Sequence, residues 1–420
     1  MTSILFLTFL GLLALGVPIA FSVGIAATTV LIIGDIPLIL IVQRMFAATD
    51  SFPLVAVPFF ILAGDLLARG TISKKLVTFA ESLMGQMRGA LSTVSVVAGM
   101  FFAAISGSGA ATTAAVGATL IPELKARNYQ EDSAAALIAS AGCIGVVIPP
   151  SVPMVLYAVI ADQSVTRLFQ NGFIPGFMMG GVLIAIAIKQ AYDKNYPKGV
   201  PFSFKNVAAT FGPAIWGIMM PLIILGGIFS GQFTPSEAAA VAVIYATMVS
   251  FFIYRDITLK ELAQIILGSA RTSAIIMIII ACSGIFGWVL ANWKIPETVA
   301  HAILSFSSDR YIILFLMAVI ILVAGVFMET SSAVILLTPV FLPLVKLIGV
   351  DLIHFGILFT VGIAIGMITP PVAINLFVAS SVTGLRIEQI AKAVVPYLMG
   401  LIIIFFSYVY LPVLFPVLIF

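Results

Sequence analysis

Two short stretches decide the fold: Gly145-Val146-Val147-Ile148-Pro149-Pro150 in the first half of the chain and Gly366-Met367-Ile368-Thr369-Pro370-Pro371 in the second. The residue numbers of their first prolines differ by 221 (370 − 149). Two other proline pairs have the same offset: Pro122 with Pro343, and Pro175 with Pro396. Three coincident pairs indicate that the chain contains a duplicated unit.

The residues around these stretches are strongly apolar. Of 420 residues, 62% are hydrophobic and 9% are charged, whereas soluble domains carry about 25% charged residues. Charge-free runs such as 89–122 and 352–385 exceed the roughly 20 helical residues that span a hydrocarbon core. Residues 314–323 (LFLMAVIILV) are apolar on every face, which excludes the alternating strands of a β-barrel. We therefore predict an all-α polytopic membrane protein, whose N-terminal apolar stretch is a retained first span.

Several functional classes are excluded by composition. The net charge of +3 is small and dispersed, so no nucleic acid is expected as a partner. Cys143 and Cys282 lie in apolar runs without metal-ligand spacing, so we expect buried thiols and no cofactor. The chain contains no HExxH or GxSxG string, and its two histidines lie far from mid-membrane serines in the predicted topology. An intramembrane enzyme is thus a remote alternative.

Each half has an overlong apolar block that becomes polar at its centre. As one helix, residues 89–122 would be about 51 Å long, well beyond a core of about 30 Å. The centre of this block is Ser106-Gly107-Ser108-Gly109, and the centre of block 311–345 is Glu329-Thr330-Ser331-Ser332. A polar turn at membrane depth must face protein or water. We predict two re-entrant helical hairpins.

The distribution of basic residues predicts the orientation of these elements. Lys74, Lys75 and Arg88 precede the first block, and Lys125 and Arg127 follow it, so both flanks are cytoplasmic. When the following membrane crossings are counted from these cytoplasmic flanks, they give inverted repeats with nine full crossings and two opposed hairpins. Segments that mix charged and apolar residues are interpreted as helices along the membrane face or as partly helical loops: 36–50, 70–88, 255–271 and 294–310.

The duplication divides the chain into three parts. Repeat I covers 1–188, and a linker with a connecting helix covers 189–236. The inverted repeat II covers 237–420. Within repeat I we predict scaffold helices in 1–88, the hairpin 89–122 and the broken helix 133–161. Within repeat II the corresponding parts are scaffold helices in 237–310, the hairpin 311–345, the broken helix 352–385 and a last helix, 393–420.

The predicted ion sites lie at the proline breaks. Inverted repeats with interrupted helices place ions near mid-membrane. Proline lacks an N–H, so the carbonyls four residues before Pro149 and Pro370, those of Gly145 and Gly366, lose their helical donor. With the carbonyls of Ile148 and Thr369 and the hydroxyls of Ser106 and Thr369, they would form one Na⁺ site per repeat. The alternative is that each proline pair only kinks a packed helix.

The predicted substrate site lies at the hairpin tips. Neither hairpin and neither Pro-Pro segment contains Lys or Arg, so an anion would be held by N–H groups such as that of Gly109 and by hydroxyls. The candidate side chains are Ser108, Ser331, Ser332 and Asn375, although Asn375 is equally consistent with a helix–helix hydrogen bond. Glu329 is the sole acid that this topology places at mid-depth. It would neutralise a cation, carry a proton or line the cavity.

Four motifs in this order resemble the large membrane (M) subunit of tripartite ATP-independent periplasmic (TRAP) transporters. They are Ala104–Gly117 (AISGSGAATTAAVG), Val147–Pro153 (VIPPSVP), Phe233–Ala242 (FTPSEAAAVA) and Ile368–Val372 (ITPPV). The resemblance covers essentially the whole chain. It implies an elevator-type ion-transporter fold in a bacterial inner membrane. It also implies Na⁺-coupled import of a small organic acid, with a small four-helix membrane subunit and a periplasmic solute-binding protein as partners, besides membrane lipid.

The resemblance also assigns residues. It implies one Na⁺ near Ser106, Gly145, Ile148 and Pro150, and another near Gly325, Gly366, Thr369 and Val372. Sialic-acid members carry an arginine where Asn292 stands here, and usually an aspartate in the first hairpin where this chain has Thr112 or Thr113. The hairpin is more similar to dicarboxylate-type members, so the expected substrate is a C4-dicarboxylate or a similar carboxylate or sulfonate. A stand-alone Na⁺- or H⁺-coupled anion symporter or antiporter is the alternative.

Overall fold

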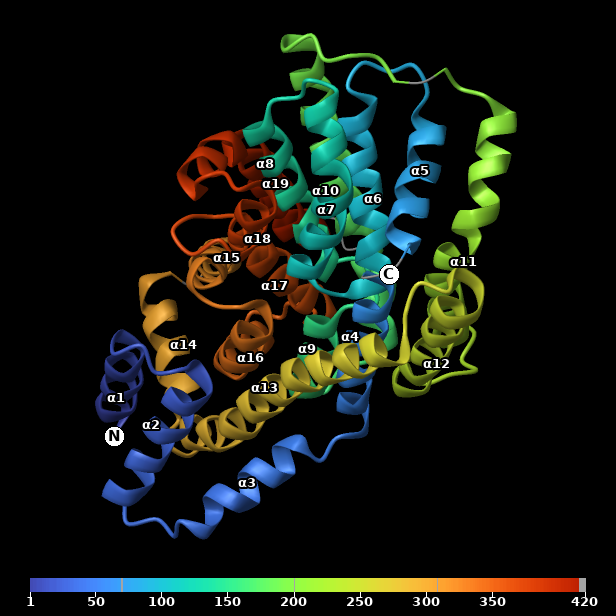
Figure 1. The fold of residues 1–420 in the computed structure, drawn as a ribbon. Helices are drawn as coiled ribbons and strands as arrows, with labels where there is room; N and C mark the ends of the chain where they lie inside the picture. Colours follow the sequence, from blue (N-terminus) through green and yellow to red (C-terminus); the bar gives the residue numbers. More distant parts are fainter. Residues whose placement is uncertain (69–70, 200, 308, 415–420) are drawn as a thin grey trace.

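A computed structural model describes residues 1–68, 71–199, 201–307 and 309–414, and side chains are described except at 299–303, 306 and 411–414. Within these ranges the chain is helical, and its only extended pairing is an isolated bridge between Arg88 and Lys198. Figure 1 shows the helices gathered into one body. Positions 69–70, 200, 308 and 415–420, which include the end of the predicted last helix, lie outside the described residues.

The described part of the first half forms ten helices and two short 3-10 turns. The helices are α1 (Thr2–Ala14), α2 (Ile19–Ile33), α3 (Ile39–Thr49), α4 (Ala56–Ala68), α5 (Ile72–Met84), α6 (Ala90–Ser106), α7 (Gly109–Ala126), α8 (Glu131–Cys143), α9 (Val152–Ala161) and α10 (Val165–Asp193). The turn η1 (Phe52–Val55) joins α3 to α4, and η2 (Ile144–Val146) follows α8.

The described part of the second half forms nine helices. They are α11 (Phe204–Phe229), α12 (Pro235–Met248) with a π-helical extension η3 (Val249–Tyr254), α13 (Leu259–Asn292), α14 (Ile295–Phe306), α15 (Arg310–Phe327), α16 (Thr330–Leu347), α17 (Leu352–Gly366), α18 (Ile374–Thr383) and α19 (Ile387–Leu414).

Helix bounds recur at the same numerical offset of 221 that relates the prolines. Adding 221 to the bounds of α7, 109 and 126, gives 330 and 347, which are the bounds of α16. The same shift carries α5, α6, α8, α9 and α10 onto α14, α15, α17, α18 and α19, with only small differences at the ends. The pair α3–α4, which is bent by 68°, corresponds to the uninterrupted α13. The Pro149-Pro150 and Pro370-Pro371 bonds are both cis.

Both overlong apolar blocks are broken at their polar centres. The helix α6 ends at Ser106, Gly107 has a left-handed φ of 60°, and α7 begins at Gly109. The helix α15 ends at Phe327, and α16 begins at Thr330 after an extended Met328 and Glu329. Left-handed backbone is accessible to glycine without a Cβ clash. Residues 89–122 and 311–345 therefore form helix pairs and not single helices.

A count of long apolar helices does not correspond one to one with the nine predicted crossings, because it includes α15 and α16 of the second hairpin and omits the shorter α1 and α2. Seven of the described helices are long and apolar enough to span a membrane, or up to eight if the bent pair α3–α4 is one span. The two proline-broken segments are absent from this count because each of their halves, α8, α9, α17 and α18, is too short to span alone. Residues 259–292, predicted as a surface segment and a separate span, form the single helix α13, which starts at a Thr258–Glu261 capping box.

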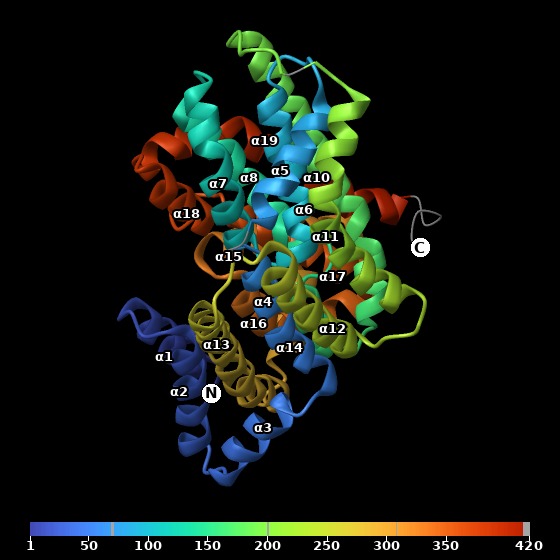
Figure 2. The same ribbon diagram turned by 45° about the vertical axis from the view of Figure 1, so that its right-hand side comes forward.

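The helices pack around two apolar cores. The larger core contains the hairpins, the broken helices and parts of α4, α5, α10, α11, α12 and α19. The smaller core joins α1 and α2 to the second half of α13. Figure 2 shows α5 standing beside α6 and α11, and Ile72, Leu76 and Phe79 of α5 are buried there. Within the predicted segment 70–88, the described helix α5 packs one apolar face on α6 and α11 and leaves Lys74 and Thr78 exposed.

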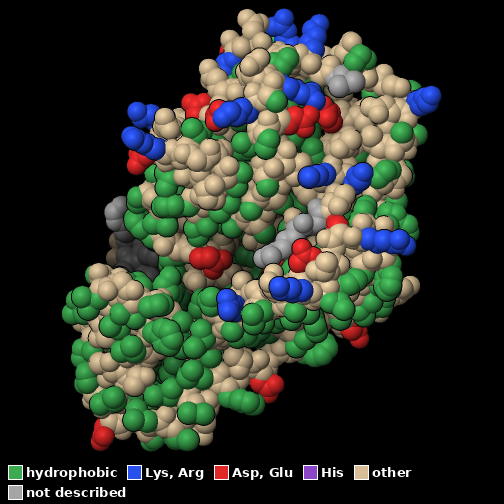
Figure 3. Space-filling model, in the orientation of Figure 1, with side chains coloured by type: hydrophobic (Ala, Val, Ile, Leu, Met, Phe, Trp, Pro, Cys, Tyr) green, Lys and Arg blue, Asp and Glu red, His purple; other side chains and the backbone are tan. Residues whose placement is uncertain are grey.

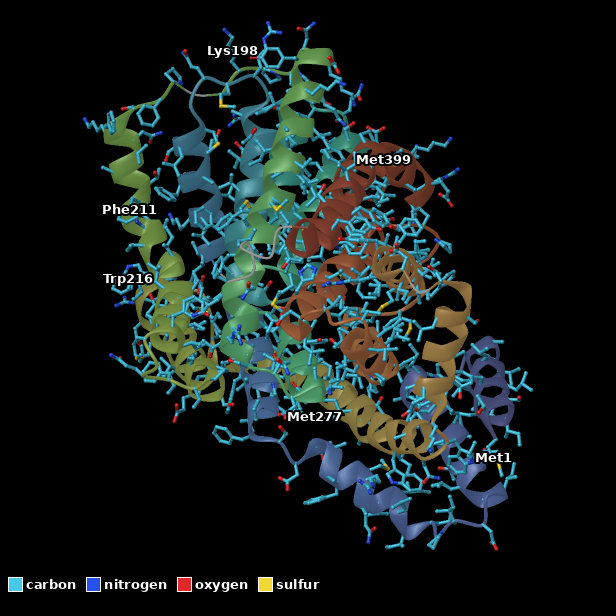
Figure 4. All side chains as sticks on the ribbon, turned by 180° about the vertical axis from the view of Figure 1, so that it is seen from behind. Met1, Lys198, Phe211, Trp216, Met277 and Met399 are labelled. Atoms are coloured by element: carbon cyan, nitrogen blue, oxygen red, sulfur yellow. The ribbon has the colours of Figure 1, made fainter. Side chains whose placement is uncertain are left out.

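The surface carries its charges unevenly. In Figure 3 Lys and Arg side chains gather at the upper end of the molecule, while hydrophobic side chains cover much of the lower half. Seen from behind, Lys198 lies at that upper end and Met1 near the opposite end (Figure 4). In Figure 3 other charged side chains lie at mid-height, and a few acids lie near the lower end. A largely apolar surface with basic residues enriched on one side is typical of a protein that is solvated by lipid along its sides.

Candidate functional site

The two hairpin tips line one cavity of about 220 Å³. The first tip contributes the segment from Ser106 to Ala111, and the second contributes Glu329, Thr330 and Ser331. The broken helices add Val146, Val152, Pro153, Met367 and Ile374. One wall comes from α4 and α13, through Ile61, Gly64, Asp65, Thr272 and Ile276.

Five pairs of lining residues are related by the offset of 221. Ser108 pairs with Glu329 (329 − 108 = 221), and Val146 pairs with Met367 (367 − 146 = 221). The remaining pairs are Gly109 with Thr330, Ala110 with Ser331 and Pro153 with Ile374. Equivalent positions of the two repeats thus meet around the same space. Interfaces between repeats with discontinuous helices are where transporters of this design place their binding sites.

Oxygen atoms cluster at the first tip. The hydroxyl oxygens of Ser106 and Thr112 lie 2.9 Å apart, and the Ser106 hydroxyl also donates to the carbonyl of Ser108 at 3.2 Å. Gly145 lies against the same group, because a Cβ at Gly145 would be 2.6 Å from Thr112 Oγ1 and 2.7 Å from the Ser108 carbonyl oxygen. Only glycine fits there, and its backbone joins the predicted oxygen cluster.

The first proline break contacts the same tip. A Cβ at Gly107 would lie 2.8 Å from the carbonyl oxygen of Pro150. Ile148 contributes its backbone to this break, while its buried side chain packs on α10 at Gly176. The structure therefore brings Ser106, Gly145 and Pro150 together and leaves the Ile148 side chain in the core.

The second break is built differently. The backbones of Gly325 in α15 and Gly366 in α17 are in contact, leaving no room for a Cβ on Gly366. Pro370 is predicted from the sequence to leave the Gly366 carbonyl without a hydrogen-bond donor. This carbonyl instead accepts from the Thr369 N–H at 3.0 Å. The Thr369 hydroxyl donates to the Ile365 carbonyl at 2.9 Å. Val372 is 38% exposed, whereas its equivalent Ser151 is fully buried.

Glu329 caps the second helix of its own hairpin. One of its carboxylate oxygens accepts from the Ser332 N–H at 3.1 Å, and the other accepts from the Ser331 hydroxyl at 3.1 Å. Ser332 is buried behind this cap and is not part of the cavity wall. Because a carboxylate offsets the positive end of a helix, α16 presents less positive potential to the cavity than α7, whose N-cap is the neutral Ser108.

Asn375 lies beside the cavity and not on its wall. Its amide nitrogen donates to the carbonyl of Ala139 in α8 at 3.1 Å, which is the helix–helix hydrogen bond considered as its alternative role. Its side-chain oxygen is buried without a hydrogen-bond partner among the described residues. The neighbouring Ile374 faces the cavity instead.

Sequence reasoning did not single out several polar contributors to the site, among them Asp65, Thr112 and Thr272. Asp65 lines the cavity and accepts a 2.6 Å hydrogen bond from Ser269 in α13, so Glu329 is not the sole acid there. Its signal was a single acid in the apolar run from Phe52 to Leu67. Thr112 belongs to the oxygen cluster of the first tip. Its signal was a hydroxyl about one turn after Ser108 in the same hairpin.

The charged side chains that line the described part of the cavity are all acidic. Its described lining contains the two acids Asp65 and Glu329 and no lysine or arginine. An anion entering this space meets carboxylates as well as helix N–H groups, and unpaired like charges repel in a medium of low dielectric constant. A cation bound nearby would remove that repulsion.

Comparison with known proteins identifies the family. The model of the tripartite ATP-independent periplasmic transporter, DctM component, matches residues 6–414. The isethionate TRAP transporter permease protein DctMQ of Oleidesulfovibrio alaskensis is 39% identical over 411 residues, which are 97% of this chain and 65% of that protein. The C4-dicarboxylate TRAP transporter large permease protein DctM of Pseudomonas aeruginosa is 38% identical, covering 93% of this chain and 92% of that protein.

A solved structure shows the same fold at low identity. The Alcanivorax borkumensis YdaH transporter has a TM-score of 0.64 and 14% identity, over 90% of this chain and 88% of that one. With the helices, the paired tips and the family match in place, the assignment follows. The chain belongs to the DctM family as a large membrane subunit of a TRAP transporter, a multi-pass inner-membrane transport protein and not an enzyme.

Proposed function

We propose that this chain carries out Na⁺-coupled secondary active import of a small organic acid. The observation that carries the proposal is the shared cavity between the hairpin tips, which combines helix N-termini, hydroxyl groups and two carboxylates. In the first turn of α7 the Ala111 N–H donates to the Ser108 hydroxyl, whereas the N–H groups of Gly109 and Ala110 have no helical acceptor, so an acid group of the substrate can accept from those two. This is anion binding without a basic side chain.

Sodium coupling is supported by the charges of the same cavity. Asp65 and Glu329 disfavour an anion unless a cation is bound close by. The oxygens of Ser106, Ser108 and Thr112 around Gly145 supply hard ligands for one Na⁺. The turn of Gly366 to Thr369 and Val372, against Gly325, is the proposed place of a second Na⁺. Binding of cation and anion would then be mutually favourable.

The proposed substrate is a C4-dicarboxylate or a small carboxylate or sulfonate such as isethionate. Two relatives across nearly the whole chain are named for these substrates. The cavity of about 220 Å³ suits an acid of this size. This chain has Asn292 at a position where sialic-acid members of the family carry arginine. The difference supports a smaller acid than sialic acid as the substrate.

The proposed partners are a small four-helix membrane subunit and a periplasmic solute-binding protein. The family membership supports both. Ligand selection would then occur first in the binding protein, and the cavity would need only to recognise a general acid group. The proposed transport movement is of the elevator type, in which the hairpins and broken helices move as a unit against α1, α2 and the long α13.

Reconstitution tests the proposal. Proteoliposomes containing this chain and its small subunit would be given radiolabelled isethionate or succinate with a matching binding protein, under an inward Na⁺ gradient. We expect accumulation that requires both the gradient and the binding protein. Accumulation driven equally by a K⁺ gradient would refute Na⁺ coupling, and uptake without any binding protein or small subunit would favour a stand-alone carrier.

A further inference from the structure

A second cavity of about 400 Å³ lies apart from the hairpin tips. One side is formed by α3, η1 and α13, and the other by α9 and α16. In Figure 4, Met277 marks α13 one turn before Ile280, the first residue of that helix on the cavity wall. Nothing in the proposed ion and substrate sites uses this space.

The cavity exists because α3 and α13 touch at one glycine and leave open space at the next. At Gly284 a Cβ would press on Ala48 and lie 2.8 Å from the carbonyl oxygen of Arg44, so the two helices are in backbone contact. The Arg44 guanidinium lies 5.8 Å from the Trp288 ring centroid and strengthens this contact. At Gly287, one turn on, a Cβ would meet nothing within 4 Å.

The lining is suited to an apolar occupant. It is made of aliphatic and small residues, with Ser51 and Ser283 as its only hydroxyl-bearing side chains. The Ser283 hydroxyl is buried and has no hydrogen-bond partner among the described residues. A cavity of this volume would hold about ten water molecules or more, and each needs two to four polar partners. Such waters would bond mainly to one another, with only the two side-chain hydroxyls of the described lining to hold them in place, so the lining favours an apolar occupant.

The surroundings indicate which kind of apolar molecule this cavity would take. Phe46, beside Ala47 and Ala48, is 70% exposed, and Phe52, beside Ser51, is 64% exposed. In a membrane protein such side chains face lipid tails. The cavity thus lies beside an exposed apolar surface that favours lipid tails over water, and its described lining carries no charged residue. The exposed charges of Arg44 in α3 and of Asp50 at its C-cap lie on the same stretch. Its volume lies within the roughly 300–1,000 Å³ range of small-molecule sites.

We propose that this second cavity binds one acyl chain of a membrane phospholipid. The chain enters between α3 and η1, covers Gly287 and packs against Ile280, Ile335 and Val159. It fills space that water would occupy only at the cost of unmet hydrogen bonds. The site thereby joins α3 and α13 to α9 and α16 through a lipid tail.

Photolabelling tests this site directly. The full chain in lipid nanodiscs would be loaded with phosphatidylethanolamine that carries a diazirine near the end of one acyl chain. After irradiation and proteolysis, mass spectrometry would locate the label. We expect label on the peptides of Ile280 and Ile335. Absence of label on both peptides, with label only on outward-facing α1 residues such as Leu7, would overturn the proposal.

Variants distinguish a bound chain from random lipid contact. Gly287→Phe fills the cavity, and we expect labelling at Ile335 to fall about tenfold, the effect of excluding roughly two methylene groups. Gly268→Phe is the matched control, because Gly268 is also an α13 glycine with nothing within 4 Å of its Cβ position. Ser283→Leu provides a second cavity-filling change, should Gly287→Phe fail to fold. Equal labelling of wild type and a folded cavity-filling variant would contradict the proposal.

Discussion

Ser108 and Glu329 occupy equivalent positions of the two hairpins (329 − 108 = 221), and each caps the hairpin's second helix through its own side chain. Ser108 Oγ accepts from the Ala111 N–H, and the Glu329 carboxylate accepts from the Ser332 N–H. Both residues line the same cavity. The two repeats therefore present one neutral and one acidic helix start to a shared space.

The cap and the charge of Glu329 are separable. Glu329→Ala removes the cap, and we expect the unfolding free energy to fall by about 1 kcal/mol. Glu329→Ser provides the same N-cap residue as Ser108 and should restore thermal stability. It also leaves the cavity with one negative charge fewer. We expect Glu329→Ser to need more Na⁺ for half-maximal uptake. Thermal unfolding and Na⁺ titration of uptake measure the two effects, and Glu329→Ser transport with unchanged Na⁺ dependence would exclude a role for the charge.

The first Na⁺ site can be tested through its hydroxyls. Ser106→Ala and Thr112→Ala each remove one oxygen from the cluster around Gly145. We expect each change to raise the Na⁺ concentration for half-maximal uptake about tenfold, the effect of one lost polar contact of about 1.4 kcal/mol. Ser95→Ala is the matched control, because Ser95 is buried in the same helix and its hydroxyl donates to the Leu91 carbonyl. Wild-type Na⁺ dependence in both variants would remove this site from the account.

The second Na⁺ site has a comparable test. Thr369→Ala should raise the Na⁺ requirement, because Thr369 lies in the turn between Gly366 and Pro370. Thr360→Ala in α17 serves as the control, since the Thr360 hydroxyl makes a similar bond to the Gly356 carbonyl at 2.8 Å. Equal Na⁺ curves for the two variants would argue against a cation at Thr369.

The contact between α15 and α17 should be sensitive to a single methyl group. Gly366→Ala places a Cβ on the Gly325 backbone, and overpacking of this kind costs about 1–3 kcal/mol. Gly212→Ala in α11 is the control, because nothing lies within 4 Å of its Cβ position and alanine favours a helix. Thermal unfolding in detergent compares them. Equal melting of both variants would mean that the two backbones do not touch.

Much of the architecture followed from local sequence signals. The polar centres at Ser106–Gly109 and Glu329–Ser332 coincide with the helix ends because a polar turn has no place inside an uninterrupted lipid-facing helix. The proline offset of 221 recurs in the helix bounds. The pairs Pro149-Pro150 and Pro370-Pro371 lie between helices, where proline interrupts helical hydrogen bonds, whereas Pro122 and Pro343 lie inside α7 and α16. The polar centres are visible in neighbouring residues and the offset in a comparison of the two halves, so one sequence suffices to find both.

Other features depend on packing that one sequence does not contain. Arg271 suggested that the surface segment 255–271 ends there. The helix α13 continues past Arg271, because one basic side chain does not interrupt helical hydrogen bonds. Asp65 interrupts an apolar stretch, so a prediction based on charge-free runs does not place it at the site. Whether Asn375 faces the cavity or α8 depends on the rotation of α18, which a lone polar residue in an apolar helix cannot determine.

Cysteine accessibility tests the central claim most directly. With the buried Cys143 and Cys282 replaced by alanine, Ala110→Cys and Ser331→Cys would each place one thiol on the cavity wall, one per hairpin. We expect a water-soluble thiol reagent to modify both, and Na⁺ but not K⁺ to slow both reactions, while Ser95→Cys in the core stays unreactive. Modification that ignores Na⁺ at both positions, or no modification at either, would contradict a shared, water-accessible Na⁺ and substrate cavity between the hairpin tips.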